Sequence, residues 1–260
     1  MARKRGRRAA ALLALVGALV ACSDPVATSA SQTFDPGEFV ASDGTSLRYR
    51  LHVPERVGSA LLPLIVFLHG SGGAGTDNQA QISGGNTYGT EAWTTPAVEG
   101  TTPVFVVAPQ IPAGSRWDAF GSDDISRFER GVLELVDALE AARPIDPDRI
   151  YLVGQSIGGM GVWDLISKRA ERFAAAVPVC GAGEPSRAAA ARSVPVWAFH
   201  GELDATVPVA GSRDMIAALR AIGADPRYTE YSDGGHDVWT RAFRDPELIP
   251  WVLAQRRRSP

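Results

Sequence analysis

Cysteine is nearly absent from this sequence of 260 residues, which contains only Cys22 and Cys180. Two cysteines cannot form the set of disulfide bonds that stabilises small secreted domains, and they cannot supply the ligands of a zinc site built from four cysteines. The clearest apolar run, residues 9–21, has thirteen apolar or glycine residues, whereas a helix needs about 20 to cross a bilayer. Composition therefore favours neither a disulfide scaffold nor a transmembrane helix.

Positive charge is scarce beyond the first residues. Five of the 26 Lys and Arg lie in the first eight residues, and residues 1–21 contain no Asp or Glu. A chain processed before Cys22 keeps 21 Lys and Arg against 29 Asp and Glu, a net charge of −8. Its last basic run, residues 256–258, is interpreted as a solvated tail. Nucleic-acid binding needs a concentrated basic face, so we expect no nucleic-acid partner.

The first 21 residues have the order of an export signal, because the basic residues precede the apolar run. Residues 19–22 (LVAC) resemble the lipobox of bacterial lipoproteins, in which the cysteine becomes the lipid-modified first residue of the mature chain. We expect a lipoprotein signal peptide over 1–21, a lipid on Cys22, and a membrane-anchored protein outside the cytoplasm, at the cell surface or in the periplasm. An ordinary thiol after an uncleaved anchor is the alternative. With Cys22 lipidated, Cys180 has no disulfide partner.

The rest of the chain is expected to form a polar tether over residues 22–36 and one domain over 37–260, with no internal repeat. Apolar runs and alternating patterns predict strands, the first of which pairs with the segment before it as a hairpin. Helical spacing of apolar residues predicts the helices. The strands are expected at 47–53, 61–68, 103–108, 149–153, 174–179, 194–199 and 227–231, and the helices at 123–142, 157–170, 209–222 and from 239 onward. This alternation predicts a mainly parallel sheet with helices on both faces.

The segment Gly154-Gln155-Ser156-Ile157-Gly158 has the pattern G-x-S-x-G between a predicted strand and a predicted helix. This pattern is typical of a nucleophile elbow, in which a strained turn exposes the serine hydroxyl and glycines remove Cβ atoms that would clash. The turn also directs the first N–H groups of the helix, including that of Ile157, towards a developing oxyanion. We predict Ser156 as a nucleophile, with a tight turn of no catalytic role as the alternative.

A serine nucleophile needs a base, and the sequence offers four histidines. His52 is expected on a half-exposed outer strand, and His69 and His200 are expected to hydrogen-bond within loops. His236 lies in a glycine-rich loop after the last predicted strand, so it is the predicted base. Asp204 is the predicted acid, because its loop follows a buried strand and the order Ser, Asp, His is that of α/β-hydrolases.

Two other carboxylates, Glu202 and Asp233, compete with Asp204 for the role of the acid. Asp237 directly follows His236 and is expected to stabilise the loop that carries this histidine.

The glycine-rich loop 69–75 (HGSGGAG) follows the first buried strand and is the predicted second half of an oxyanion hole. We expect the Ser71 N–H to act together with the Ile157 N–H. The same loop satisfies G-x-G-x-x-G, and Glu91 lies at the distance of a ribose-binding acid, so an exported dinucleotide-binding protein is an alternative. The loop is followed by a poor helix sequence, which weakens this alternative.

Six segments together resemble the α/β-hydrolase esterases of the phospholipase/carboxylesterase and predicted-peptidase type, close to polyhydroxyalkanoate-depolymerase-like and feruloyl-esterase-like branches. They are PLIVFLHGSGGAGTDN, VVAPQIPAGSRW, DPDRIYLVGQSIGGMGVWDL, RFAAAVPVCGAG, FHGELDATVPV and GGHDVW. The resemblance implies an α/β-hydrolase fold and ester hydrolysis through an acyl-enzyme, with no metal and no organic cofactor. It places the nucleophile on Ser156, the acid on Asp204 and the base on His236.

The substrate pocket is the least defined part of the prediction. Trp117 and Trp239 adjoin the motifs and are candidate pocket residues, whereas Trp163 and Met160 are expected in the core. We expect a small-molecule or polymer ester with a short acyl, aryl or carbohydrate-linked group. An exported serine peptidase and a binding protein with a degenerate site are the alternatives, and the sequence does not indicate the oligomeric state.

Overall fold

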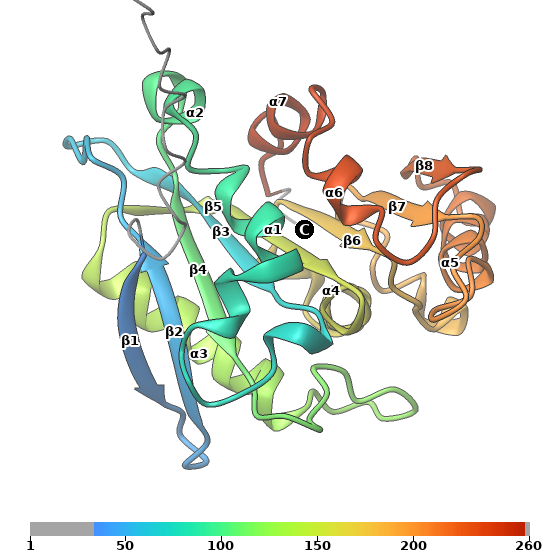
Figure 1. The fold of residues 1–260 in the computed structure, drawn as a ribbon, viewed down its shortest axis with the longest axis horizontal. Coiled ribbons are helices and arrows are strands. Elements are labelled where there is room, and N and C mark those ends of the chain that lie inside the picture. Colours follow the sequence, from blue (N-terminus) through green and yellow to red (C-terminus); the bar gives the residue numbers. More distant parts are fainter. Residues whose placement is uncertain (1–33, 258–260) are drawn as a thin grey trace, which may run out of the picture.

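The computed structural model describes residues 34–257, which form an eight-stranded sheet in the order β1-β2-β4-β3-β5-β6-β7-β8 (Figure 1). The pairs β1–β2 and β2–β4 are antiparallel, and all other pairs are parallel. The strands are β1 (Asp35–Val40), β2 (Ser46–His52), β3 (Leu62–Leu68), β4 (Phe105–Gln110), β5 (Ile145–Gln155), β6 (Ala175–Val179), β7 (Trp197–Gly201) and β8 (Arg227–Tyr231). The predicted hairpin and the mainly parallel sheet are therefore confirmed.

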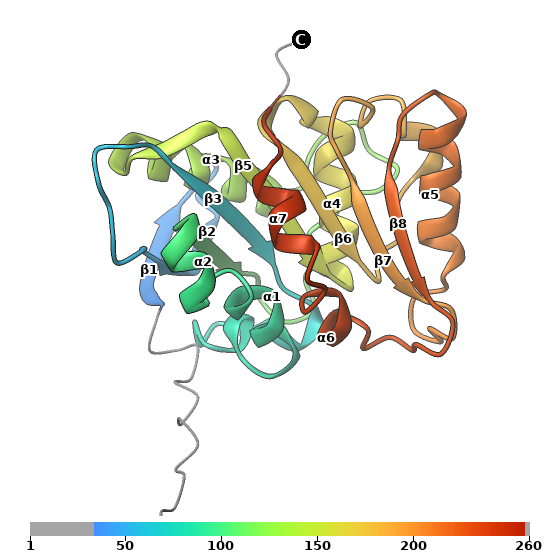
Figure 2. The same ribbon diagram turned by 90° about the horizontal axis from the view of Figure 1, so that it is seen from above.

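Helices cover both faces of the sheet, so the central strands are buried on both sides. Helices α3, α4 and α5 pack on one face, and α1, α2, α6 and α7 pack on the other (Figure 2). The helices are α1 (Thr87–Glu91), α2 (Pro96–Thr101), α3 (Arg127–Ala142), α4 (Ile157–Lys168), α5 (Ala210–Ala221), α6 (Trp239–Ala242) and α7 (Leu248–Leu253). Short 3-10 turns are η2 (Ser71–Gly73), η3 (Ala80–Ile82), η4 (Gly84–Asn86), η5 (Ala170–Arg172) and η6 (Pro185–Arg187). Each face has its own apolar core.

Two of the predicted helices differ from the structure by more than two residues at a boundary. Helix α3 begins at Arg127 because Ser126 and Glu129 form a capping box, in which each side chain accepts a hydrogen bond from the backbone of the other residue. The single helix expected from residue 239 is instead two short helices, α6 and α7. Pro246 lies between them, where it cannot continue a helix.

The N-terminal predictions fall mostly outside the described residues. The signal peptide 1–21, Cys22 and residues 23–33 of the expected tether lie there. The ordered domain begins before residue 37, since Phe34 is buried and β1 starts at Asp35. Within residues 34–257, no helix combines the length and apolar character required to span a bilayer.

Candidate active site

Ser156 lies in a sharp turn between β5 and α4, at the carboxyl edge of the sheet. Its φ of 56° and ψ of −122° are strained for a residue with a side chain. The flanking glycines make the turn possible: a Cβ on Gly154 would lie 2.5 Å from the Gly158 oxygen, and a Cβ on Gly158 would lie 2.0 Å from the Leu68 oxygen. The predicted nucleophile elbow therefore has the expected geometry.

The structure brings Ser156, His236 and Asp204 into one hydrogen-bonded chain. Ser156 Oγ lies 2.9 Å from His236 Nε2, and His236 Nδ1 lies 2.7 Å from Asp204 Oδ2. These residues are separated by 80 and 32 positions along the sequence. An ionised Asp204 accepts a hydrogen bond from Nδ1–H, so Nε2 carries no hydrogen and can accept the serine proton. This geometry fits a Ser-His-Asp catalytic triad.

Asp204 is held in its charged form although it is buried. Burial alone would raise the pKa of this carboxyl, but hydrogen bonds from His236 and from the N–H groups of Val207 and Thr206 outweigh it, so the pKa lies below its usual value. The two N–H groups donate to Oδ1 at 2.8 and 2.9 Å. The other oxygen, Oδ2, faces two imidazoles, with His236 Nδ1 at 2.7 Å and His200 Nε2 at 3.2 Å. Asp204 is ionised at neutral pH and orients His236.

The two competing acids lie away from His236. Glu202 is paired with Arg213 at 3.6 Å, and Asp233 is paired with Arg241 at 2.7 Å. Both carboxylates are exposed, and neither is hydrogen-bonded to His236. Among the three acids considered, only Asp204 is placed to orient the imidazole.

Ser71 and Ile157 both occupy the first position of a helix, in η2 and α4 respectively. An N–H at this position has no acceptor within its own helix, so it is available to a ligand. The Ser71 loop is close to the nucleophile, because a Cβ on Gly70 would lie 3.4 Å from the Ser156 Cβ. This arrangement fits an oxyanion hole. Three-residue 3-10 turns follow the glycines instead of the helix that a dinucleotide-binding loop requires.

His69 supports the glycine-rich loop, as predicted. Its Nδ1–H donates to the Gly70 oxygen at 2.7 Å, and its Nε2 accepts from the Ile111 N–H at 3.2 Å. Burial lowers the pKa of His69 to about 4, so the imidazole is neutral. Trp117 contacts the same histidine: its ring packs against His69 edge to face, and its Nε1–H donates to the His69 oxygen at 3.1 Å.

The prediction of Trp117 as a pocket residue is wrong, because its side chain is fully buried. Trp239, in contrast, is partly exposed and packs edge to face against His236, with ring centroids 5.2 Å apart. It is placed to line the site. Trp163 is buried, as expected. Met160 is only half-buried, and its sulfur accepts a hydrogen bond from the Arg116 guanidinium at 3.3 Å, so it is not a core residue.

The predictions for the other two histidines, His52 and His200, have different outcomes. The prediction of a half-exposed His52 is wrong, because the side chain is buried against Phe34, with its Nε2 2.6 Å from Glu99. The residues that cover it come from distant segments, which strand periodicity does not reveal. His200 is buried near the end of β7, and its Nε2 lies 2.9 Å from the Val207 oxygen in the following loop, as the prediction of a loop-building role requires.

Cys180 is a neighbour of the triad that the sequence did not indicate. It follows β6, has a φ of 48°, and is fully buried. Its sulfur and one ligand atom each of Asp204 and His236 lie within 4.8 Å of one another. Burial raises the pKa of the Cys180 thiol to about 12, the charge of Asp204 adds to this effect, and backbone hydrogen bonds from Gly201 and Val238 oppose it.

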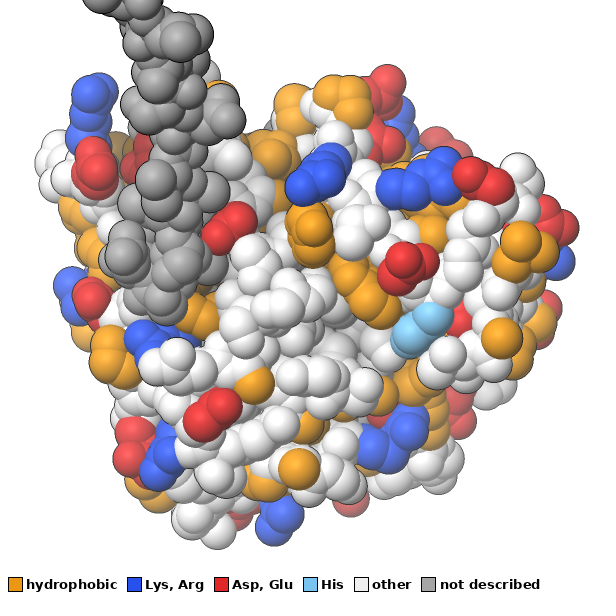
Figure 3. All heavy atoms as spheres, viewed as in Figure 1, with side chains coloured by type: hydrophobic (Ala, Val, Ile, Leu, Met, Phe, Trp, Pro, Cys, Tyr) orange, Lys and Arg blue, Asp and Glu red, His pale blue; other side chains and the backbone are white. Residues whose placement is uncertain are grey.

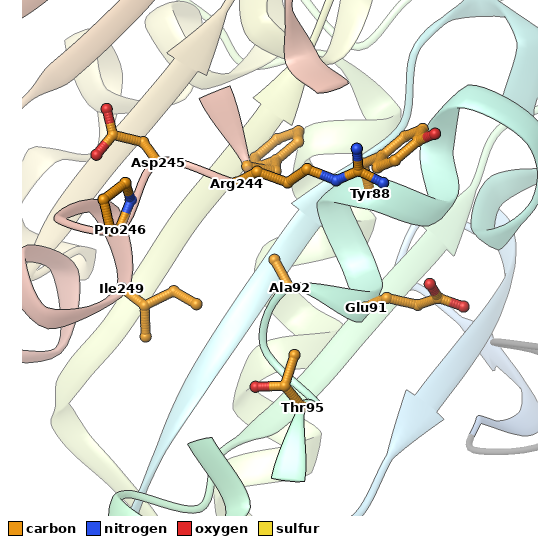
Figure 4. Close-up of a pocket in the computed structure, with 9 residues that line it drawn as sticks. Tyr88, Glu91, Ala92, Thr95, Arg244, Asp245, Pro246 and Ile249 are labelled. Atoms are coloured by element: carbon orange, nitrogen blue, oxygen red, sulfur yellow. The ribbon is translucent and has the colours of Figure 1, made fainter. Parts of the chain in front are cut away.

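Figure 3 shows histidine side-chain surface on the face seen in Figure 1, beside hydrophobic and acidic side chains. A cavity of about 370 Å³ lies between α1 and the segment that joins α6 to α7, where the Arg244 guanidinium lies over the Tyr88 ring (Figure 4). Its walls are Tyr88, Glu91, Ala92, Thr95, Phe243, Arg244, Asp245, Pro246 and Ile249. None of these belongs to the triad, so this cavity is separate from the nucleophile.

Residues 113–245 match the model of the dienelactone hydrolase family, and this segment holds all three triad residues. The chain belongs to that family. Its eight-stranded sheet has the architecture of the α/β-hydrolase fold, which confirms the predicted fold class.

Relatives named as esterases share large parts of the chain. NocK of Nocardia uniformis subsp. tsuyamanensis, a protein assigned as an esterase, is 30% identical over 190 residues, which cover 70% of this chain and 52% of NocK. The bifunctional acetylxylan esterase/xylanase XynS20E of Neocallimastix patriciarum is 33% identical over 144 residues, 55% of this chain and 19% of that protein. The crystal structure of a thermostable esterase has a TM-score of 0.82 and 35% identity over 87% of this chain and 64% of that chain. This chain thus spans about half the length, or less, of these two curated relatives.

Proposed function

We propose that the protein is a serine esterase that hydrolyses carboxylic esters through an acyl-enzyme. The observation that carries the proposal is the hydrogen-bonded chain from Ser156 through His236 to Asp204. Membership of the dienelactone hydrolase family and the similarity to proteins named as esterases support the reaction class. No step of this chemistry requires a cofactor.

In the first half-reaction, Ser156 Oγ attacks the ester carbonyl carbon while His236 Nε2 takes the hydroxyl proton. Asp204 holds the imidazole in the required tautomer and stabilises the imidazolium. His236 then gives its proton to the leaving alkoxide, and the alcohol departs. In the second half-reaction His236 takes a proton from water, the resulting hydroxide attacks the acyl carbon, and the acid is released as the proton returns to Ser156.

The negative charge that develops on the carbonyl oxygen requires fixed donors. The N–H groups of Ser71 and Ile157 are proposed to supply them, since each opens a helix beside the nucleophile. One such donor contributes about 3 kcal/mol to transition-state stabilisation. The N-terminus of α4 adds a favourable partial positive charge.

The proposed substrates are esters with a short acyl, aryl or carbohydrate-linked group. The similarity to an acetylxylan esterase/xylanase supports a carbohydrate-linked ester, and Trp239 beside His236 offers an aromatic wall for a sugar or an aryl ring. Screening acyl length together with feruloyl and acetylated-sugar esters would rank these classes by kcat/KM.

The decisive test is hydrolysis of a short p-nitrophenyl ester by the purified protein and by Ser156→Ala. We expect turnover by the wild type and at least a ~10³-fold loss in the variant. Ser232→Ala is the matched control, because Ser232 is exposed on the loop that carries His236. A fluorophosphonate probe should label the wild type at Ser156. Equal activity of Ser156→Ala and wild type would overturn the proposal.

A serine peptidase with the same triad is the second candidate. The same preparation tested on N-acylated peptide amides distinguishes the two reactions. An amide is the harder substrate, because its carbonyl carbon is less electrophilic and its nitrogen is a poorer leaving group than an alkoxide, so the reaction depends more strongly on protonation by His236. A kcat/KM for peptides that exceeds the value for every ester tested would favour the peptidase.

We also propose that the protein works outside the cytoplasm, anchored through a lipid on Cys22. The basic and apolar order of residues 1–21 and the LVAC motif support this location. The partners would then be the membrane lipid and an extracytoplasmic small-molecule or polymer ester.

A further inference from the structure

Three side chains with different metal-ligating atoms lie close together, and one of them is the imidazole of the proposed base. Cys180, Asp204 and His236 follow β6, β7 and β8, three adjacent parallel strands that deliver them to the same edge of the sheet. Sulfur, nitrogen and carboxylate oxygen together are the donors that zinc prefers, whereas Mg²⁺ and Ca²⁺ prefer oxygen alone. We propose that Cys180, Asp204 and His236 form a site for a zinc-like divalent cation, and that the bound ion switches the esterase off.

The cluster is close to the size of a tetrahedral zinc site. Bonds of about 2.0 Å to nitrogen and oxygen place these two atoms about 3.3 Å apart, and a bond of about 2.3 Å to sulfur places it about 3.5 Å from either. His236 Nδ1 and Asp204 Oδ2 are 2.7 Å apart, and Cys180 Sγ lies within 4.8 Å of one ligand atom of each of these residues. Shifts of about 1 Å would therefore form the site, with water as the fourth ligand.

Burial holds two of the three ligands in place. Cys180 and Asp204 have fully buried side chains, which anchors two of the ligands. The third ligand is on a loop with Gly234 and Gly235, which gives His236 room to adjust.

Metal binding at Nδ1 removes the base. The metal–sulfur and metal–nitrogen bonds replace the S–H and Nδ1–H bonds. The thiol proton leaves to solvent, and the imidazole proton moves from Nδ1 to Nε2. Nε2 then carries a hydrogen and cannot accept the proton of Ser156, so acylation stops. The ion thus competes with the hydrogen bond between His236 and Asp204.

The activity test compares zinc titrations of the untagged full-length wild type and Cys180→Ala, each normalised to its own metal-free rate. We expect stoichiometric inhibition of the wild type, reversal by a chelator, and at least a ~10-fold higher half-inhibiting zinc concentration in the variant. Mg²⁺ should have no effect. An unchanged wild-type rate in millimolar zinc, or equal inhibition of both proteins, would overturn the proposal.

A second measurement does not depend on activity, although the proposed consequence of metal binding rests on the proposed triad. Ser156→Ala retains all three ligands and should bind one Co²⁺ with a thiolate charge-transfer band in the near ultraviolet. The emission of Trp239, which contacts His236, should change with the same stoichiometry. The double variant Ser156→Ala, Cys180→Ala should lack the band. Absence of the band from Ser156→Ala would reject the site even if the protein proves to be an esterase.

Discussion

At the scale of single residues, the strained backbone positions gather at the site. Within residues 34–257 three residues other than glycine have a positive φ: Asn78, Ser156 and Cys180. Ser156 and Cys180 follow the adjacent strands β5 and β6, and the N–H of Ser156 donates to the Val179 oxygen at 2.9 Å. Strain of this kind costs about 1–3 kcal/mol per residue and persists only where packing enforces it. Two of the three strained residues thus belong to the neighbourhood of the triad.

Asp204→Asn tests the role of the acid. An asparagine amide cannot stabilise the imidazolium, and its NH2 group favours the wrong tautomer of His236, so kcat should fall by about 10³- to 10⁴-fold. KM should change little, since Asp204 is buried away from the solvent side of the site. Ester hydrolysis under saturating substrate measures the effect.

Glu202→Gln and Asp233→Asn are the matched controls for this experiment. Both acids are paired with surface arginines rather than with His236, so kcat should stay within about twofold of the wild type. A large loss of kcat in either control, together with a small loss in Asp204→Asn, would mean that Asp204 is not the acid.

At the scale of elements, α3 and α4 are joined by a buried charged cluster. Lys168 pairs with Asp164 at 2.7 Å inside α4, and both side chains are almost fully buried. The same two residues hold the segment before α3: Asp164 accepts from the Ala119 N–H, and the Lys168 ammonium donates to the Ala119 oxygen. Glu129 of α3 is buried beside them and accepts from the Ser126 N–H at 2.8 Å.

This cluster predicts a pH-dependent stability. Burial, and then the charge of Asp164, raise the pKa of Glu129 from 4.5 to about 9, whereas the Ser126 N–H and Lys168 oppose the shift. The folded protein therefore holds a proton that the unfolded chain loses above pH 4.5. The stability contributed by this proton is fully present below pH 4.5 and is lost as pH rises to about 9. The slope is at most about 1.4 kcal/mol per pH unit.

Glu129→Gln should remove this slope, because glutamine keeps an acceptor for Ser126 and does not ionise. Urea unfolding of wild type and variant at about pH 5 and about pH 8 measures it: the variant should gain stability relative to the wild type at the higher pH. An equal difference at both pH values would mean that Glu129 is ionised in the folded protein.

The contact between α4 and β3 depends on Gly158. A Cβ there would meet the Leu68 oxygen at 2.0 Å and the His69 oxygen at 2.8 Å, and these backbone atoms cannot move independently. Gly158→Ala should destabilise the fold by about 3 kcal/mol or more and lower the thermal midpoint. Gly100→Ala in α2 is the control, since no atom lies within 4 Å of the new methyl group. A midpoint for Gly158→Ala equal to that of Gly100→Ala would contradict the close contact.

The single helix expected from residue 239 is two short helices, α6 and α7, in the structure. Pro246 separates α6 from α7 in the segment expected to be one helix, and Pro250 lies in the first turn of α7, where proline is tolerated. The prolines are visible in the sequence, so this boundary was predictable. The start of α3 was also predictable, because Ser126 and Glu129 have the spacing of a capping box.

At the scale of the whole molecule, the proposed location depends on one residue. Labelled palmitate should enter the full-length wild type but not Cys22→Ala, and the wild type should partition into detergent. Cys180→Ala is the control, because Cys180 is buried in the domain and should leave labelling unchanged. Equal labelling of the wild type and Cys22→Ala would remove the lipoprotein proposal.

The amino-acid sequence alone predicted most of the strands, the long helices and the nucleophile elbow, because these depend on short-range patterns: buried apolar strands, helical spacing, and G-x-S-x-G between a strand and a helix. It also determined the charge balance and the scarcity of cysteine. The family resemblance and the chain order of Ser156, Asp204 and His236 were enough to select the triad residues before any distance was known.

Which side chains meet depends on the tertiary structure. The sheet order brings the ends of β5, β6, β7 and β8 together, and this places Cys180 beside Asp204 and His236. It also buries Trp117 against His69, and His52 against Phe34, from segments that have no local relation to them. The physical reason is that burial depends on packing between distant elements, whereas periodicity reports only which side of its own strand or helix a residue faces.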